Sequence, residues 1–316
     1  HLMQINNPVI NRIIYFTLSS LLGAVFIFSG YIKLYPIEAF ELNFIDVGIA
    51  NWLTAPIIAR LLIGLEIGLG LLLLLQFQHR KFTLKAVLAL LIFFTLYLVY
   101  AIIKDGNSGN CGCFGTYLEM TPLQSIIKNL AMIGFIGVLW YININVKWRY
   151  NLAVWIVSIS ISVALPFIIN PPDFYMAQYI TEGKANYILP LELLTDKEFN
   201  NDELISKLKT GKHIVAFLSA TCPHCKIAAL KLHIMHNQHP TWKIQFIVAG
   251  DKKRLPKFWE ETKSNDVPYI HFPSDNFVKL SGPEVPVIMA LNNGVVKKKF
   301  SHINLKDTDL LPYVTP

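Results

Sequence analysis

The sequence predicts two structural parts, a multi-pass α-helical membrane domain and, after it, a smaller α/β domain. Three observations support this fold class. Long apolar segments recur between residues 13 and 169, whereas the rest of the chain is polar and alternates between strand and helix patterns. A Cys-Pro-His-Cys motif stands where one of the expected strands gives way to a helix.

The composition agrees with a membrane protein and excludes one class of partner. Hydrophobic residues make up 53% of the 316 residues and charged residues only 16%, which is unusual for a soluble protein of this length. The formal net charge of +7 is spread over both parts of the chain, without a dense basic block among aromatic residues. We therefore expect no nucleic acid as a partner.

Apolar segments that are long enough to cross a bilayer, which takes about 20 residues per helix, occur in succession. We predict five spans, at residues 13–31, 56–77, 84–103, 123–142 and 152–169. One short apolar segment can also be a buried helix of a soluble core, but a series of them favours a membrane bundle. The first segment lacks a cleavage site of small residues, so we expect a retained span and not a signal peptide.

Basic residues between the spans predict the orientation of the chain. Arg12 and the segments 79–85 and 147–149 are basic, whereas the segments 32–55 and 104–122 contain more acidic than basic residues. The positive-inside rule places the basic segments in the cytoplasm. The N-terminus is then cytoplasmic, and the C-terminal domain lies outside because it follows an odd number of spans.

The four cysteines form two close pairs, Cys111-Gly112-Cys113 and Cys222-Pro223-His224-Cys225. In the predicted orientation both pairs face an extracytoplasmic space, where disulfides form and persist. A disulfide between Cys111 and Cys113 would close a very small ring, for which Gly112 supplies backbone freedom. Strain in such a ring makes a disulfide more oxidising. We interpret this pair as an exchange site; a structural bridge and a metal-binding pair are the alternatives.

The C-terminal part is expected to begin with a linker at 173–194. Helices are predicted at 196–209, 221–236, 255–263 and 275–280, and strands at 213–219, 243–249 and 269–272. Two more strands, 287–291 and 295–300, flank Asn292-Asn293-Gly294, a sequence that is typical of a tight hairpin turn.

This order of elements, with Cys-x-x-Cys at a strand-to-helix junction, resembles the thioredoxin fold over residues 195–316. Val285-Pro286 stands where thioredoxin-like proteins keep a cis-proline, so the resemblance implies that Pro286 faces the dithiol. It also implies that Cys222 attacks from a helix N-terminus, which stabilises a thiolate, and that Cys225 resolves the mixed disulfide. Half of a zinc site is the alternative, but the chain has no second Cys-x-x-Cys.

The Pro-His dipeptide matches that of the bacterial oxidant DsbA, which implies an oxidising disulfide with His224 as a positive partner of Cys222. One position departs from thioredoxin, because Ala216 stands where thioredoxin has a buried aspartate. Proton transfer must therefore differ. Three histidines follow the motif, and we interpret them as a solvated helix end and expect no metal; they are His233, His236 and His239.

Residues 13–142 resemble the DoxX-like family of four-helix membrane proteins, and in particular its MauE branch. The resemblance rests on the stretches 26–33, 60–66 and 110–115, of which the last, Asn-Cys-Gly-Cys-Phe-Gly, is the most specific. It implies a protein of the bacterial cytoplasmic membrane whose periplasmic thiol chemistry is linked to a membrane quinone. The expected domains are a four-helix membrane domain at 1–150, a fifth transmembrane helix with the linker at 151–194, and a thioredoxin-like domain at 195–316.

Glu66 is an ionisable side chain inside the second predicted span, where such groups usually face an internal cavity. It is either a proton relay beside a quinone or the Cys111–Cys113 pair, or one half of an interhelical hydrogen bond, for which Lys128 is a candidate partner. Arg60 is expected on another face of that helix, nearer the outer interface. Two tyrosines of the third span line a quinone site or belong to an aromatic belt; they are Tyr97 and Tyr100.

The leading hypothesis is a membrane thiol:disulfide oxidoreductase. Electrons would pass from client thiols to Cys222–Cys225, then to Cys111–Cys113 and then to a membrane quinone, and the reverse direction uses the same groups. The expected partners are extracytoplasmic client proteins with thiols or disulfides, membrane lipid and quinone. The second hypothesis is a maturation or assembly factor with a client-specific redox chaperone domain. A channel gated by Glu66 has little support beyond that carboxylate.

Overall fold

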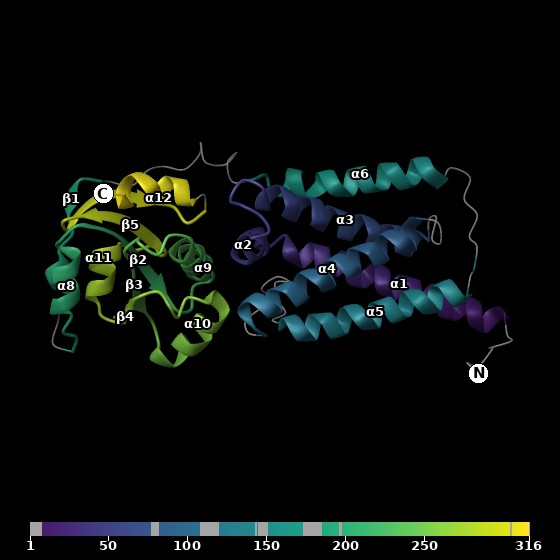
Figure 1. Ribbon diagram of the computed structural model, residues 1–316, viewed down its shortest axis with the longest axis horizontal. Coiled ribbons are helices and arrows are strands. Elements are labelled where there is room, and N and C mark those ends of the chain that lie inside the picture. The colour runs from purple at the N-terminus through teal and green to yellow at the C-terminus, as the bar shows by residue number, and fades with distance from the viewer. Residues whose placement is uncertain are drawn as a thin grey trace. The chain divides into compact units, whose positions relative to one another are not determined.

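The computed structural model describes residues 8–76, 82–107, 120–142, 144, 151–172, 185–195, 198–303 and 305–315. Cys111 and Cys113 lie outside the described residues. The chain forms two compact units, residues 1–172 and residues 173–316 (Figure 1).

The first unit is a bundle of long apolar helices. Its long helices are α1 (Pro8–Lys33), α3 (Ala55–Leu75), α4 (Leu84–Asp105), α5 (Pro122–Ile142) and α6 (Asn151–Ile169). Within the described residues, five helices are long and apolar enough to cross a membrane, and they coincide with the five predicted spans, although α1 begins earlier than expected.

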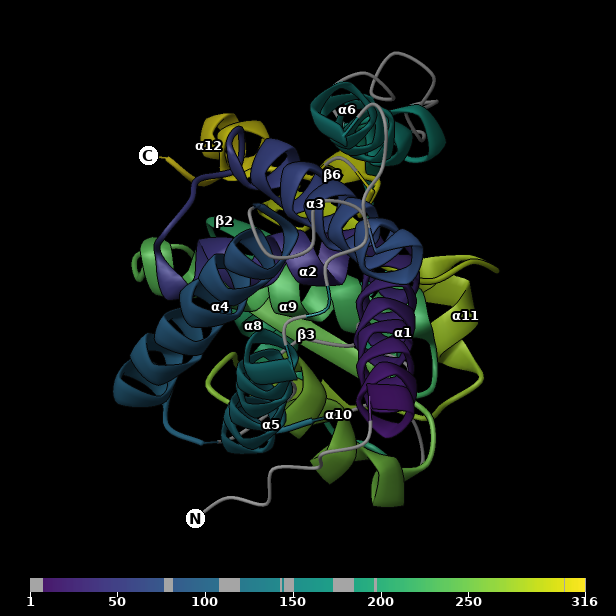
Figure 2. The ribbon, with the colours of Figure 1, turned by 90° about the vertical axis from the view of Figure 1, so that its right-hand side faces the viewer.

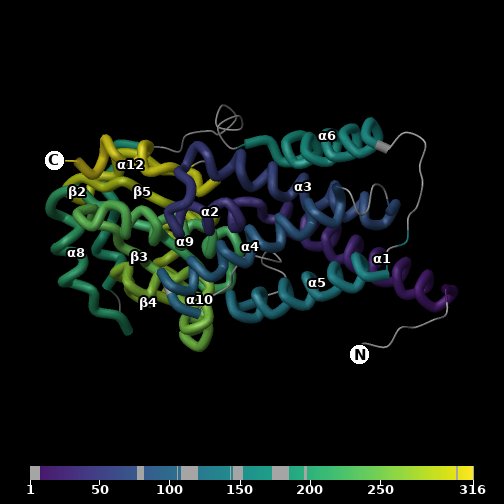
Figure 3. The backbone as a smooth tube through the Cα atoms, turned by 45° about the vertical axis from the view of Figure 1, so that its right-hand side comes forward, coloured from purple at the N-terminus to yellow at the C-terminus, as the bar shows by residue number. Residues whose placement is uncertain are grey.

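Helix α3 makes the most extensive packing in the bundle, because it contacts both α1 and α6, while α4 packs on α5 and α5 on α1. Figure 2 looks along the bundle and shows α6 beside α3, and Figure 3 shows α4 alongside α5. Glycines allow the closest approaches, as is common between membrane helices. A Cβ atom on Gly64 would lie 2.5 Å from the Cα of Val163 in α6, so no larger residue fits there without a backbone shift.

A helix that the sequence analysis did not predict lies between the first two spans. Helix α2 (Ile37–Val47) occupies much of the segment that was expected to be a loop. Ile37, Phe40 and Phe44 recur at helical spacing and are buried, which gives the segment an apolar face to pack on the bundle. The helix ends at Gly48, whose φ of 83° is the left-handed conformation that glycine adopts readily after a helix.

The second unit has a mixed six-stranded sheet with the strand order β1-β6-β5-β2-β3-β4. The strands are β1 (Tyr187–Ile188), β2 (Lys212–Ser219), β3 (Ile244–Ala249), β4 (Tyr269–His271), β5 (Val287–Asn292) and β6 (Val295–Phe300). Strands β2, β3 and β4 are parallel, whereas β5 is antiparallel to both β2 and β6, and β6 to β1. This sheet, with helices between its strands, is the thioredoxin-like fold that the sequence predicts.

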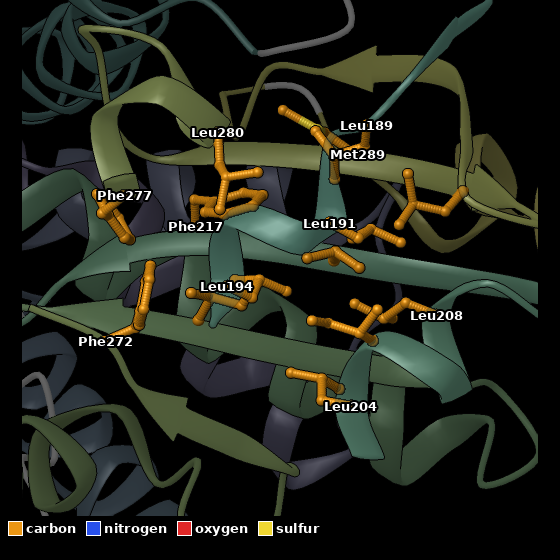
Figure 4. Close-up of a cluster of buried hydrophobic side chains, with 14 of the residues drawn as sticks. Leu189, Leu191, Leu194, Leu204, Leu208, Phe217, Phe272, Phe277, Leu280 and Met289 are labelled. Carbon is orange, nitrogen blue, oxygen red and sulfur yellow. The ribbon is translucent and has the colours of Figure 1, made fainter. Parts of the chain in front are cut away.

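Helices cover both faces of this sheet. They are η3 (Leu191–Leu194), α8 (Asp202–Leu208), α9 (Pro223–Gln238), η4 (Lys252–Arg254), α10 (Leu255–Thr262), α11 (Asn276–Ser281) and α12 (Asp307–Val314). Figure 4 shows the core on one face, where Phe217 and Met289 of the sheet meet side chains of η3, α8 and α11. Ala216 alternates with Phe217 along β2 and is fully buried on the opposite face. A central strand that is buried on both faces explains the unbroken apolar run in its sequence.

Three local predictions differ from the structure. The expected linker at 173–194 contains β1 and η3, and the helix expected at 196–209 is only α8, Asp202–Leu208. Helix α8 begins later than expected because a turn precedes it, in which the Asn201 side-chain amide donates a hydrogen bond to the Leu194 carbonyl oxygen at 2.7 Å. Helix α12 was not predicted. The β5–β6 hairpin is confirmed, because Asn293 and Gly294 both have positive φ, 52° and 76°, as a two-residue hairpin turn requires.

Candidate active site

Cys222 is the N-cap residue of α9, three residues after the end of β2. Its backbone is extended, and its Sγ accepts a hydrogen bond from the Cys225 backbone N–H at 3.4 Å. Pro223 follows as the first helical residue, where a missing N–H group has no consequence. The remaining free N–H groups and the helix dipole favour a negative charge at this sulfur atom. The structure thus places Cys222 where the sequence predicted an attacking thiolate.

The two cysteines of the motif differ in accessibility. Cys222 is partly exposed, whereas Cys225 is fully buried, and both are free thiols. Burial raises the pKa of the Cys225 thiol well above its ordinary value, and the neighbouring Cys222 raises it further. Only Cys222 is therefore suited to meet an external thiol or disulfide, and Cys225 is one helical turn away from it, as a resolving thiol must be.

The segment before β5 borders the Cys222 sulfur atom. The Val285–Pro286 peptide bond is cis, as in the proteins that the sequence resembles. The Val285 carbonyl oxygen lies 3.8 Å from the Cys222 Sγ. Pro286 thus lies beside the dithiol.

His224 contacts a second histidine that the sequence analysis did not single out. The His224 Nδ1 and the His302 Nε2 are 3.3 Å apart. His302 belongs to the segment between β6 and α12, and no local sequence pattern connects it with the motif, so only the fold reveals the pair.

Two ionisable side chains of α9, Lys226 and His233, interact with residues other than the two cysteines. Lys226, next to Cys225 in sequence, pairs with Glu261 of α10. His233 uses both ring nitrogens, with Nδ1 at 2.8 Å from an Asp266 carboxylate oxygen and Nε2 at 3.1 Å from the Asn237 amide. The sequence analysis expected a solvated helix end here, but His233 is buried and both of its ring nitrogens have partners.

Ala216 leaves the position of the thioredoxin aspartate apolar. On β2 it lies opposite Phe246 of β3 and Ile288 of β5, both fully buried. Because residue 216 is an alanine, no carboxylate at this position can accept the proton of the buried Cys225 thiol. That proton must leave through another group or through water.

In the membrane unit, Glu66 forms an ion pair with Lys33. The Lys33 Nζ lies 2.6 and 2.7 Å from the two Glu66 carboxylate oxygens and donates to Ser29 at 2.9 Å. Lys33 and Glu66 are only 2% and 5% exposed, so α1 and α3 share a charge pair inside the bundle. The sequence analysis named Lys128 as a candidate partner, whereas the structure pairs Glu66 with Lys33. Lys33 was missed because it stands at the end of the first span, where a lysine usually extends to the interface.

A small cavity adjoins this ion pair. Its volume is about 30 Å³, room for one or two water molecules and much too little for a quinone ring. Its lining includes Phe94, Tyr97, Lys128 and Asn129 besides the ion pair. Tyr100, by contrast, is exposed on the surface of the unit. Glu66 and Lys33 thus border a cavity of the size of one or two water molecules.

Arg60 is fully buried within the unit. Its Nη1 lies 2.5 Å from a Glu41 carboxylate oxygen of α2. Its Nε and Nη2 donate to the carbonyl oxygens of Asn170 and Pro171, at 2.6 and 3.1 Å. Arg60 thus ties α2 and the end of α6 to α3, which is a structural role.

The membrane unit matches a known family. Residues 11–142 match the model of the methylamine utilisation protein MauE. The N-terminal part of this chain is therefore similar to the MauE family. The match covers α1, α2, α3, α4 and α5, and therefore includes the Lys33–Glu66 pair and the Cys111-Gly112-Cys113 motif.

The similarity to one relative extends over both units. Protein TlpB of Flavobacterium psychrophilum is 27% identical over 300 aligned residues, which cover 80% of this chain and 81% of that protein. The C-terminal unit also has similar solved structures. A thiol:disulfide interchange protein from Bacteroides sp. is 19% identical and aligns with 42% of this chain and 91% of its own, with a TM-score of 0.31. A secreted disulfide oxidoreductase of Mycobacterium tuberculosis is 14% identical, aligns with 34% and 84%, and has a TM-score of 0.30.

The chain thus combines a membrane unit that matches the MauE model with a thioredoxin-like unit whose Cys-x-x-Cys dithiol stands at a helix N-terminus.

Proposed function

We propose that this protein is a thiol:disulfide oxidoreductase of a bacterial cytoplasmic membrane that oxidises thiols of extracytoplasmic client proteins. The observation that carries the proposal is the asymmetry of the C-terminal dithiol, in which Cys222 caps a helix and is accessible while Cys225 is buried behind it. The excess of basic residues in the segments 79–85 and 147–149 supports an extracytoplasmic location for this unit.

In the first reaction, a client thiolate attacks the Cys222–Cys225 disulfide at the Cys222 sulfur atom. The Cys222–Cys225 bond breaks and a client–Cys222 bond forms, with Cys225 leaving as a thiolate. The second client thiolate then attacks the mixed disulfide and releases Cys222, whose thiolate is stabilised at the start of α9. Two electrons have passed to the protein, which now holds the dithiol.

In the second reaction, the Cys222 thiolate reduces a Cys111–Cys113 disulfide by the same kind of exchange. The Cys111–Cys113 dithiol then reduces a membrane quinone, a substrate that arrives through the lipid, and the two electrons and two protons leave as a hydroquinone. The small ring between i and i+2 cysteines supports this order, because strain makes a disulfide a better oxidant.

The Lys33–Glu66 pair supplies a proton carrier for the membrane half of the relay. A carboxylate beside a cavity with room for one or two water molecules can exchange a proton with them, and Lys33 is the ion-pair partner of this carboxylate. The cavity lies in the unit whose α4–α5 connection carries Cys111 and Cys113. We assign Glu66 to proton transfer and do not place the quinone in this cavity.

A test follows from the two dithiols. The purified protein in detergent, supplied with a reduced dithiol peptide and a soluble quinone, should oxidise the peptide through many turnovers. Cys222→Ser should abolish the reaction, and Cys225→Ser should accumulate a peptide mixed disulfide at Cys222. Cys111→Ser should leave one stoichiometric oxidation per protein and then stop. Continued turnover of Cys111→Ser would refute the relay.

A second function is supported by the MauE match alone, since that family model describes a methylamine utilisation protein. The protein would then be a maturation factor, whose redox domain serves one extracytoplasmic complex. Stable co-purification of one partner, together with full biological function of a Cys111→Ser, Cys113→Ser variant, would favour this function over the relay.

A further inference from the structure

His302 lies against the redox motif from a distant part of the chain. Its ring centroid is 5.2 Å from that of His224, with the rings tilted by 59°. His224 follows Cys222 by two residues in the first turn of α9. The ring that contacts His302 is therefore the one that stands between the two cysteines in sequence.

Lys231 holds the segment that carries His302. Lys231 is only 4% exposed, and its Nζ donates to the carbonyl oxygens of His302 and Ile303 at 2.6 and 3.0 Å. It follows His224 by about two helical turns, so both side chains project from the same face of α9. One face of α9 thus carries both His224 and Lys231, which binds the segment that contains His302.

His302 is neutral at the pH of most living compartments. Burial, followed by the positive charge of Lys231 and the neighbouring His224, lowers the pKa of His302 to about 4. A neutral imidazole has one nitrogen that accepts a hydrogen bond, whereas a protonated ring only donates. With Nε2 as its acceptor, His302 can receive the Nδ1–H of a protonated His224, and it adds no competing positive charge.

We propose that His302 is a positioning residue of the redox site, which accepts a hydrogen bond from His224 and thereby stabilises the His224 imidazolium two residues after Cys222, in the first turn of α9. A positive charge there favours the Cys222 thiolate, stabilises the reduced dithiol and makes the disulfide more oxidising. His302 acts only through His224 and takes part in no bond making or breaking. The inference rests on the thiol chemistry proposed above.

The test measures the equilibrium of the Cys222–Cys225 disulfide with glutathione in the full-length protein in detergent, with Cys111 and Cys113 replaced by serine. His302→Phe removes the acceptor, and we expect the equilibrium constant for reduction to fall about tenfold, or about 30 mV for this two-electron couple. The Cys222 pKa, followed by thiolate absorbance, should rise in the same variant. His302→Gln keeps an acceptor oxygen and should retain most of both values.

Two further variants separate positioning from general destabilisation. His236→Gln is the matched control, because His236 lies about 18 Å along the same helix from His224 and should change neither value. Lys231→Met releases the carbonyl groups of 302 and 303 and should shift the equilibrium in the direction of His302→Phe. The double variant should shift it no further than His302→Phe alone, because both changes remove one interaction.

Unchanged glutathione equilibria and Cys222 pKa values in His302→Phe, or equal shifts in His302→Phe and His302→Gln, would overturn the assignment of His302. The measurement needs no client protein and no quinone, so it is independent of the relay. If Cys222–Cys225 forms no disulfide with glutathione in the parent protein, the proposed function itself fails.

Discussion

The two units bind buried lysines with different groups. In the membrane unit, Lys33 pairs with the carboxylate of Glu66, a group that can itself gain and lose a proton. In the C-terminal unit, Lys231 is bound by two backbone carbonyl groups, which cannot titrate. The difference separates two uses of a buried cation, since the first can take part in proton transfer, whereas the second can only hold a segment in place.

The largest effect should appear within the C-terminal dithiol. In the fully reduced protein, iodoacetamide should alkylate Cys222 at least about a hundred times faster than Cys225, because the thiolate is the nucleophile and burial raises the pKa of Cys225. Mass spectrometry of the native protein at neutral pH measures both rates, and the unfolded protein is the control in which they should converge. Comparable native rates would remove the basis for assigning different roles to the two cysteines.

In the membrane unit, removing one member of the Lys33–Glu66 pair should destabilise the bundle by about 3–5 kcal/mol, because the other charge stays buried. Thermal unfolding in detergent should show this loss for Lys33→Met and for Glu66→Met. The double variant Lys33→Met, Glu66→Met leaves no unpaired charge and should recover most of the stability.

Quinone-linked turnover distinguishes a role of the Lys33–Glu66 pair in proton transfer from a purely structural role. The double variant should stay inactive with quinone while Cys222 still exchanges with glutathione. A stable double variant with normal quinone-linked turnover would show that the pair has only a structural role.

A substitution at the α3–α6 contact should have a smaller effect on stability, and a glycine of α5 provides the matched control. Gly64→Ala should loosen α6 from α3 and cost about 1–3 kcal/mol, because the new Cβ would meet the backbone of α6 at 2.5 to 2.8 Å. Gly137→Ala in α5 has no atom within 4 Å of its new Cβ and should be neutral or slightly stabilising. Unfolding of both variants in the same detergent gives the comparison, and equal midpoints would contradict the packing of α3 against α6.

The smallest effect concerns acid stability of the C-terminal unit. The pKa of His302 is about 4 in the folded chain and about 6.5 in the unfolded chain, so the unfolded state takes up this proton first. Above pH 6.5 His302 is neutral in both the folded and the unfolded chain, and its ionisation costs no stability. As the pH falls from 6.5 toward 4, the unfolded chain binds the proton preferentially and the free energy of unfolding decreases. His302→Gln should make the loss over this window shallower in denaturant titrations, whereas an unchanged slope would argue against a neutral, buried His302.

The fold and the dithiol were largely predictable because each depends on local sequence. Apolar length defines the spans, and the positions of Cys222, Cys225 and the Asn293-Gly294 turn follow from strand and helix patterns. The partners of Glu66 and His224 were not predictable in this way. Lys33 and His302 are far from them in sequence, and only helix packing and the course of the chain after β6 bring each pair together.

Helix α2 was missed for a related reason. The segment between the first two spans contains acidic residues, which favoured a loop outside the bilayer. The buried pairing of Glu41 with Arg60 removes the main obstacle to packing this segment on the bundle as a helix. The charge of Glu41 therefore gave a misleading signal, because its partner lies on another helix.

The most direct test of the central claim is electron transfer between the two cysteine pairs. The purified, fully reduced protein is mixed with a soluble quinone without oxygen, and free thiols at each pair are counted over time by differential alkylation and mass spectrometry. We expect both pairs to become oxidised, and Cys222–Cys225 to stay reduced when Cys111 and Cys113 are serines. Oxidation of Cys222–Cys225 at the same rate in that variant would contradict the relay.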